Sequence, residues 1–128
     1  MTWRAMRRLG RMDIEYPGFG RIRVAGIDYY HDIVIDAGKV RARDKKPSKT
    51  LRSRYGHTPL SEAEEIPWSG RRLIIGSGYS GMLPIVPQLT EEAAAHGVEL
   101  EIMPTAEACA LLRTLMVEDA NAVLHVTC

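Results

Sequence analysis

The stretch that decides the fold is LIIGSGYSGMLPIVPQLTEEAAAHG, residues 73–97. It opens with three consecutive apolar residues, a pattern typical of a strand that is buried on both faces. It closes with a segment that begins at Pro87 and stops at Gly97. Proline at the first helical position and glycine just past the last one are typical of a helix. The stretch therefore predicts a buried strand, a glycine-containing turn and a helix.

The segments that follow continue this alternation. Residues 98–103 alternate as a strand, and residues 106–116 carry an apolar stripe behind Thr105, which we expect to be the N-cap of a second helix. Residues 122–128, AVLHVTC, close the chain as a third strand. The C-terminal half thus predicts a β-α-β-α-β unit. The crossover rule favours parallel strands with the helices packed on the sheet.

The N-terminal half has a β pattern. Residues 20–26 alternate as a half-buried strand, residues 27–36 continue with β-branched and aromatic residues, and residues 39–43 form a third strand. Tight turns between them predict an antiparallel meander. The fold class is therefore α/β, with a mixed central sheet, an N-terminal β-meander and the C-terminal β-α-β-α-β unit.

Two segments between these halves are less regular. Residues 44–58 have no apolar period and predict a basic loop. Residues 59–66 predict a short helix, because Ser61 followed by Glu64 is the spelling of a capping box.

The glycines of Gly76-x-Gly78-x-x-Gly81 are spaced like those of a dinucleotide-binding fingerprint. Such a site needs a helix that opens at the motif, but Pro84 and Pro87 would break one. We therefore expect no nucleotide cofactor. Free backbone N–H groups in this turn could form an anion nest, which either a ligand or the chain's own terminal carboxylate would fill.

Charge is segregated along the chain, whose net charge is only +1. Residues 39–57 carry eight basic side chains and one acidic side chain. Such a run is either a solvated loop or a surface for an anionic partner. We predict a ligand pocket formed by Arg54, Tyr55, His57, Gly76, Ser77, Gly78, Thr127 and Cys128, beside a basic patch formed by Lys45, Lys46, Lys49 and Arg52.

Catalytic chemistry is not indicated. The four histidines follow no zinc-binding pattern, and the two cysteines fit no disulfide or metal framework. Alternation along the last strand sends His125 and Cys128 to opposite faces, against a thiolate–imidazole pair. We assign no catalytic residue, no metal and no cofactor, and we lean against an enzyme.

The remaining organisation is simple. Residues 1–12 carry four arginines and no acid, and they predict a basic, disordered extension. Residues 13–128 predict a single domain. No apolar run is long enough to span a membrane, and the sparse cysteines suit a cytoplasmic location.

Several motifs resemble the Mth-938-like family, catalogued as domain of unknown function 498. They are RYGH at residues 54–57, LIIGSG at 73–78, VPQLTEEAAAHGVELEIMPTAEA at 86–108 and HVTC at 125–128. The family includes small archaeal and bacterial proteins and the mitochondrial complex I assembly factor 3. The resemblance implies a three-layer α/β fold. It also implies action through protein interaction in assembly rather than catalysis.

Three hypotheses about function follow. The first is a non-enzymatic protein-interaction or assembly factor with an unidentified protein partner. The second is binding or turnover of a small anion between Gly76–Gly78 and the Arg54/His57 loop. The third and weakest is nucleic-acid binding through residues 39–57. Exposed sheet edges also make a homodimer one expected assembly.

Overall fold

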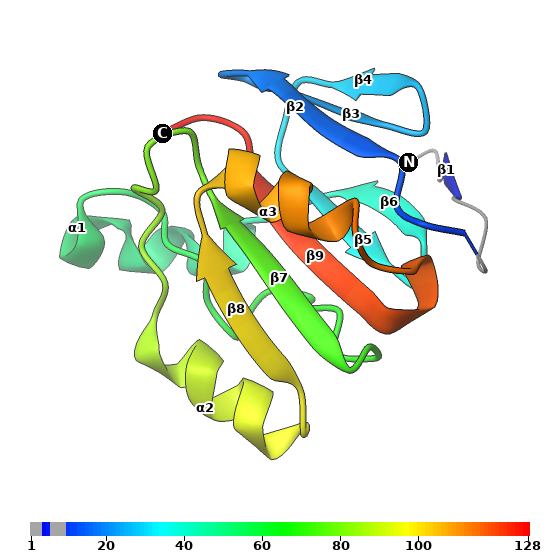
Figure 1. The fold of residues 1–128 in the computed structure, drawn as a ribbon. Coiled ribbons are helices and arrows are strands. Elements are labelled where there is room, and N and C mark those ends of the chain that lie inside the picture. The colour runs from blue at the N-terminus through cyan, green and yellow to red at the C-terminus, as the bar shows by residue number, and fades with distance from the viewer. Residues whose placement is uncertain (1–3, 6–9) are drawn as a thin grey trace.

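The computed structural model describes residues 4–5 and 10–128 of the chain. Within these residues, the strands form one sheet of six strands and one sheet of three strands. Figure 1 shows the larger sheet running through the centre of the molecule, with the smaller sheet above it and helices beside it.

The central sheet consists of β1 (Arg4–Ala5), β6 (Lys39–Ala42), β5 (Ile33–Asp36), β9 (Ala120–His125), β7 (Arg72–Ser77) and β8 (Glu99–Met103), in that spatial order. β7 pairs in parallel with β8 and with β9. The pairs β5–β9, β5–β6 and β1–β6 are antiparallel. The sheet is therefore mixed, as the sequence predicts.

The predicted β-α-β-α-β unit is confirmed. Helix α2 (Pro87–Ala95) connects β7 to β8, and α3 (Thr105–Leu112) followed by the 3-10 turn η2 (Val117–Asp119) leads to β9. Gly97 lies just past α2 with a φ of +69°, which glycine adopts without strain. Because β7 and β9 run in parallel, their carboxyl ends meet at one edge of the sheet.

The three-stranded sheet is an antiparallel meander of β2 (Ile14–Gly18), β3 (Arg21–Val24) and β4 (Ile27–Tyr29). A continuous strand over residues 27–36 is wrong, because β4 and β5 belong to different sheets. The chain changes sheets at Asp32. Its carbonyl accepts a hydrogen bond from Arg43 N, and its carboxylate accepts one from Val126 N. These bonds hold Asp32 outside both sheets.

The segment between the two halves differs from the prediction. Residues 44–58 are not a plain loop, because they contain the 3-10 helix η1 (Lys46–Leu51) and the short helix α1 (Arg52–Tyr55). Residues 59–66 form a β-bridge at Leu60, one turn and irregular backbone rather than the predicted helix. Ser61 and Glu64 are both buried, and their side chains bond to other parts of the fold. The capping-box spelling therefore marks a buried polar network.

The start of α3 also differs. The N-cap is Pro104, and Thr105 is the first helical residue. The hydroxyl of Thr105 accepts a hydrogen bond from Gly78 N at 2.9 Å and donates one to His125 O at 2.6 Å. Thr105 thus ties α3 to the ends of β7 and β9 instead of capping the helix.

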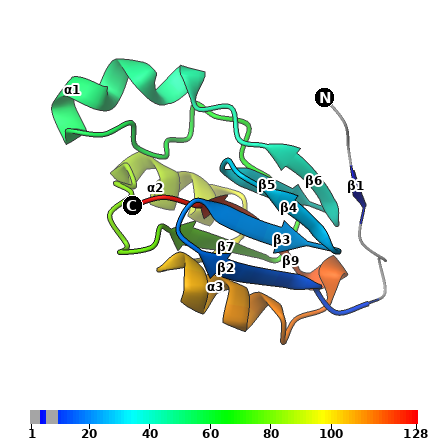
Figure 2. The ribbon, with the colours of Figure 1, turned by 90° about the horizontal axis from the view of Figure 1, so that it is seen from above.

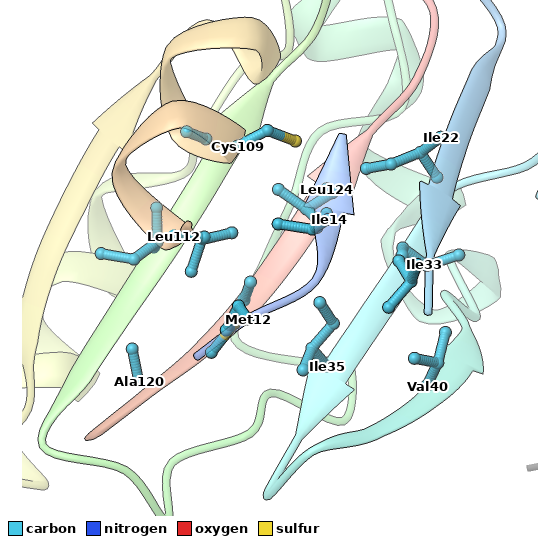
Figure 3. Packing of buried hydrophobic residues seen from close by; sticks show 14 of the residues in the cluster. Met12, Ile14, Ile22, Ile33, Ile35, Val40, Cys109, Leu112, Ala120 and Leu124 are labelled. Carbon is cyan, nitrogen blue, oxygen red and sulfur yellow. The ribbon is translucent and has the colours of Figure 1, made fainter. Parts of the chain in front are cut away.

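Figure 3 shows the larger buried cluster, in which side chains of α3 and the three-stranded sheet meet one face of the central sheet. Its labelled members are Met12, Ile14, Ile22, Ile33, Ile35, Val40, Cys109, Leu112, Ala120 and Leu124. Met12 is 3% exposed, so the core reaches into the segment that the sequence assigned to the basic extension. Residues 1–3 and 6–9 of that predicted extension lie outside the described part of the chain.

A second cluster covers the opposite face of the sheet. Val34, Leu73, Ile75 and Val123 pack there against α2 and the loops beside it. Figure 2 shows α1 and α3 at opposite sides of the molecule, with strands between them. The central sheet is thus the middle of three layers, as the predicted fold class requires. Among the helices of the described residues, none has the length and apolarity needed to cross a membrane.

Candidate functional site

A pocket of about 350 Å³ lies where β7 and β9 end. Its wall comes from the chain after β9, the loop after β7, and the segment that carries η1 and α1. Figure 1 shows the C-terminal residue beside the loop that follows β7. The lining residues are Arg43, Lys45, Lys49, Arg52, His57, Thr58, Met82, Leu83, Pro84, His125, Thr127 and Cys128.

Asp32 organises the inner side of this pocket. Its Oδ1 accepts a hydrogen bond from Val126 N at 2.9 Å. Its Oδ2 lies 2.9 Å from Nη1 of Arg43 and 2.8 Å from Nδ1 of His125. The Asp32 side chain is 12% exposed. One buried carboxylate therefore joins the segment before β5 to the segments that follow β6 and β9.

Arg43 extends this network inward to Glu64. Its Nε and Nη2 donate to the two carboxylate oxygens of Glu64 at 2.8 and 2.9 Å, and Nη2 also donates to Pro59 O at 2.9 Å. The side chains of Arg43 and Glu64 are 2% and 3% exposed. Losing one partner of such a pair would leave a buried charge uncompensated.

Two buried serines complete the network. The Ser48 hydroxyl donates to Oε2 of Glu64, and its oxygen lies 2.6 Å from the Ser61 hydroxyl. Ser48 belongs to η1, between the pocket residues Lys45 and Lys49. Its buried hydroxyl therefore anchors the segment that carries the pocket's basic side chains.

Asp32 and Arg43 in this network remain ionised. Burial alone would raise the pKa of Asp32, but His125, the N–H of Val126 and the Arg43 charge outweigh it and hold that pKa below its usual value. Burial alone would lower the pKa of Arg43, whereas Glu64 and Asp32 raise it. Asp32 thus remains a carboxylate and Arg43 a guanidinium at neutral pH.

His125, the last residue of β9, presents its ring to the pocket. Its Nδ1 faces Asp32, while its Nε2 lies 3.3 Å from Oγ1 of Thr127. Residues two apart in an extended chain share a face, which brings these two side chains together. When Nδ1 carries the proton that bonds to Asp32, Nε2 holds a free lone pair beside Thr127.

Positive charge dominates the lining of the pocket. Lys45, Lys49, Arg52 and His57 line it, and no acidic side chain among the described residues does. Within the described chain, Lys45, Lys49 and Arg52 form no ion pair. These cations therefore face the pocket without an ion-pair partner among the described residues, although the carboxylate of the last residue, Cys128, also lies at the pocket.

The predicted basic segment is divided by the fold. Arg54, Tyr55 and Lys46 do not line the pocket. Tyr55 packs against the second buried cluster, and the Arg54 guanidinium lies 5.9 Å from the centre of the Tyr55 ring. Arg41 faces inward, where its Nη2 donates to Glu65 O at 2.6 Å. The band of residues 39–57 is therefore not one continuous basic surface.

The predicted anion nest after Gly78 is occupied by the chain itself. Tyr79 N donates to Thr127 O at 2.7 Å, and Ser80 N donates to Cys128 O at 3.3 Å. The sequence left open whether a ligand or the end of the chain would fill this nest. In the structure these N–H groups bond to the backbone oxygens of the last two residues.

Gly76 and Gly78 allow neighbouring segments of the chain to pack closely against the end of β7. A Cβ at Gly76 would lie 2.8 Å from Oγ1 of Thr105, and a Cβ at Gly78 would overlap the carbonyl carbon of Cys128. Ser77 between them is 5% exposed. The structure therefore brings His57, Thr127 and Cys128 of the predicted pocket together with Lys45, Lys49 and Arg52 of the predicted patch. It leaves the three turn residues buried at the side.

Sequence reasoning missed the residues that hold the site together. Asp32 lies inside an apparent strand, Arg43 inside a basic run, and Ser48 in a segment without periodicity. Only Ser61 and Glu64 gave a signal, through the capping-box spelling, and it pointed to a different structure. The described residues contain no group of three His, Cys, Asp or Glu side chains that could hold a metal ion.

Comparison with known proteins places the chain in context. Residues 14–126 match the model of a family described as "Protein of unknown function (DUF498/DUF598)". No curated protein matches the chain.

Several solved structures share the fold. The conserved hypothetical protein PH1505 from Pyrococcus horikoshii OT3 is 28% identical with a TM-score of 0.75, over 91% of this chain and 100% of that one. The protein MT938 is 27% identical with a TM-score of 0.69, over 91% and 99% of the two chains. A Bartonella henselae protein described as an outer membrane protein is 18% identical with a TM-score of 0.63, over 94% and 99%. This last likeness shows the fold alone.

Proposed function

Because the chain belongs to the DUF498/DUF598 family of proteins of unknown function, its role has to be inferred from its own site, and we propose that it binds a small anionic molecule in the pocket where β7 and β9 end. One observation carries the proposal. Lys45, Lys49, Arg52 and His57 line this pocket, and no described lining residue has an acidic side chain. A concave site lined by one sign of charge concentrates ligands of the other sign.

The support beneath these side chains favours binding. Ser48 and Glu64 anchor the basic segment, and Asp32 orients His125, which lines the same pocket. Groups held in place before the ligand arrives lose less conformational entropy on binding. A volume of about 350 Å³ suits a small metabolite. We therefore expect a ligand with a phosphate or several carboxylates.

A matched pair of variants tests the proposal. Arg52 lines the pocket, whereas Arg54, two residues on in the same short helix, does not. Thermal unfolding is measured with inorganic phosphate, pyrophosphate and citrate. A ligand at one hundred times its Kd adds about 2.7 kcal/mol to the free energy of unfolding. We expect this stabilisation in the wild type and in Arg54→Ala, and a clear reduction in Arg52→Ala.

Other outcomes would contradict the proposal. Equal stabilisation of both variants would place the anion elsewhere, and no stabilisation by any of the three anions would remove the pocket as an anion site. A short single-stranded oligonucleotide serves as a comparison. Stabilisation by the oligonucleotide alone, falling steeply with salt, would favour the nucleic-acid hypothesis instead.

A second candidate function is protein interaction, the role of an assembly factor. Phe19, Tyr79 and Met82 are 58%, 60% and 59% exposed, and the rings of Phe19 and Tyr79 lie 6.0 Å apart. Met82 also lines the basic pocket. An apolar surface beside unpaired cations suits a protein partner that presents apolar and acidic side chains together.

Paired substitutions test this second candidate. An acidic, aromatic-containing peptide library is screened against the wild type, Tyr79→Ser and Ile102→Ser. Ile102 is 45% exposed and lies on β8, the edge strand farthest in order from β1, so it serves as the control. Selected peptides should lose affinity with Tyr79→Ser and keep it with Ile102→Ser. Equal affinity for both variants would count against this surface.

A further inference from the structure

Resting on the proposed anion site, we propose that His125 accepts the phosphoryl group of an acyl phosphate at Nε2 and passes it to water. The geometry that leads to this inference is an imidazole fixed on one side by a carboxylate and open on the other side to a basic pocket. The proposal narrows the ligand class from small anions to activated phosphoryl donors.

The orientation of the ring is the first argument. Asp32 Oδ2 lies 2.8 Å from Nδ1 of His125 and sets which nitrogen carries the proton. Arg43 holds the same Oδ2 at 2.9 Å, so the carboxylate cannot turn away easily. Nε2 is therefore the unprotonated nitrogen of the imidazole. Its lone pair is the one with which a histidine acts as a nucleophile.

The accessibility of Nε2 is the second argument. Its described partner is the Thr127 hydroxyl at 3.3 Å, which is longer than an ordinary N–H···O or O–H···N bond. The His125 side chain is 16% exposed and lines the pocket together with Thr127. A lone pair held this weakly is available to an electrophile that enters the pocket.

The charge around the ring is the third argument. Lys45, Lys49, Arg52 and His57 share the pocket with His125, and Asp32 and Arg43 face the ring from the inner side. A phosphoryl group carries negative charge on its equatorial oxygens throughout transfer, and catalysis consists mainly of positioning and neutralising it. The cations that line the pocket with His125 supply that neutralisation.

The chemistry balances with water as the only co-reactant. The Nε2 lone pair attacks phosphorus, the bond from phosphorus to the acyl oxygen breaks, and the carboxylate leaves with that electron pair. The imidazole ring gains positive charge, which the Asp32 carboxylate offsets through Nδ1–H. Water then attacks phosphorus, the N–P bond breaks back to Nε2, and inorganic phosphate is released with the water's protons on phosphate and solvent. The net reaction is acyl phosphate plus water to carboxylate plus phosphate.

The lining residues favour this class of donor. An alkyl phosphate needs a general acid for its alkoxide leaving group, and a histidine or lysine of the pocket would have to supply that proton. A carboxylate leaving group needs no proton. An acyl phosphate thus requires only the nucleophile and the cations that line the pocket.

The experiment treats the full chain with acetyl phosphate at mildly alkaline pH. Phosphohistidine is followed by 31P NMR, and the site is mapped by mass spectrometry without acid treatment. We expect the adduct at His125 and its loss in His125→Asn. His96 is exposed, stacks on Trp68 and lies outside the pocket, so it serves as the internal control. It should stay unmodified.

Testing the role of Asp32 requires a measurement that a general loss of stability would not change. In Asp32→Asn, labelling should slow at least about tenfold, as for a lost imidazole-orienting carboxylate. At the same time 15N NMR should show His125 leaving the single tautomer with its proton on Nδ1. Slower labelling with that tautomer unchanged would remove Asp32 from this role.

The experiment distinguishes failure of phosphoryl transfer from failure of the anion site. If phosphate binds with saturation but His125 is never labelled, phosphoryl transfer is overturned and the anion site stands. If neither occurs, both proposals fall. Labelling of His96 and His125 at equal rates would show unspecific reactivity and would also overturn the proposal. The wild-type protein alone decides these outcomes, so they do not depend on whether a variant folds.

Discussion

The carboxyl ends of β7 and β9 lie side by side at one edge of the central sheet, yet they differ in what they offer a ligand. After β7, Gly76 and Gly78 are packed against the chain, and the following N–H groups bond to the last two residues. At the end of β9, His125 and Thr127 face a pocket. The glycine-rich end is closed, and the end without glycine is open.

The difference shows two uses of a strand end. Glycine gives a backbone room to approach another segment, and here that segment is the chain's own end. A side chain at a strand end is available to a ligand only if other groups hold it in place. Asp32 does so for His125, and Arg43 and Glu64 in turn hold Asp32.

Breaking the closed end should have the largest effect. In Gly78→Ala, the new Cβ would overlap the carbonyl carbon of Cys128, and the φ of +108° is strained for any other residue. Strain and overpacking together should lower the free energy of unfolding by about 3 kcal/mol or more. Urea unfolding at neutral pH measures it.

The control for this prediction is Gly20→Ala. Gly20 also has a positive φ, +82°, but a Cβ there would meet nothing within 4 Å. Gly20→Ala should therefore lower the free energy of unfolding only through backbone strain, by about 1–2 kcal/mol. Equal losses in the two variants would show that the packing against Cys128 contributes nothing.

Breaking the support of the open end comes next. Glu64→Gln removes the charge that faces the buried Arg43 guanidinium, and breaking such a pair typically costs about 3–5 kcal/mol. We expect the lower part of that range, because the amide keeps one acceptor oxygen.

Chemical unfolding of Glu64→Gln, compared with that of Glu15→Gln, measures this loss of stability. Glu15 pairs with Arg23 at 2.8 Å but is 55% exposed, so its loss should cost less than about 1 kcal/mol. Similar costs at both sites would contradict the buried network.

Acid should weaken the open end through Asp32. Its pKa is lowered in the folded chain, although burial alone would raise it, because His125, Val126 N–H and Arg43 outweigh burial. The stabilisation by the ionised carboxylate is therefore complete above the usual pKa of about 4 and is lost as pH falls through the lowered folded value. Unfolding free energies between about pH 2 and pH 6 should fall less steeply in Asp32→Asn than in the wild type. Parallel curves would contradict this account.

The smallest effect concerns the two thiols. Burial raises the pKa of Cys109 to about 12, whereas Cys128 is exposed beside the pocket. Since the thiolate is the reactive form, a thiol reagent at neutral pH should modify Cys128 and spare Cys109 until the chain unfolds. Peptide mapping after partial labelling checks this. Early modification of Cys109 would show that the core around α3 opens readily.

Much of the fold could be predicted because its signals are local. Three apolar residues before Gly76, and the Pro87 and Gly97 boundaries of α2, each specify an element through short-range physical chemistry. The break between β4 and β5 could not be predicted. It depends on bonds from Asp32 to Arg43 and Val126, which are distant in sequence.

The candidate site was predictable only in part. The basic residues were visible as a charge run, but which of them face the pocket depends on how η1 and α1 turn. Arg52 and Arg54 are indistinguishable in sequence, and only the fold places the first in the wall. The buried Ser48–Glu64–Arg43 network is specified by burial, which a single sequence does not reveal.

The most direct test of the central claim is a phosphate titration followed by 15N NMR of the Arg52 and Arg54 side chains and the His125 ring. The open end of β9 predicts saturable shifts of Arg52 and His125 with one dissociation constant, while Arg54 stays unchanged. Saturable shifts at Arg54 without Arg52 and His125, or no saturable shift at any of the three, would contradict it.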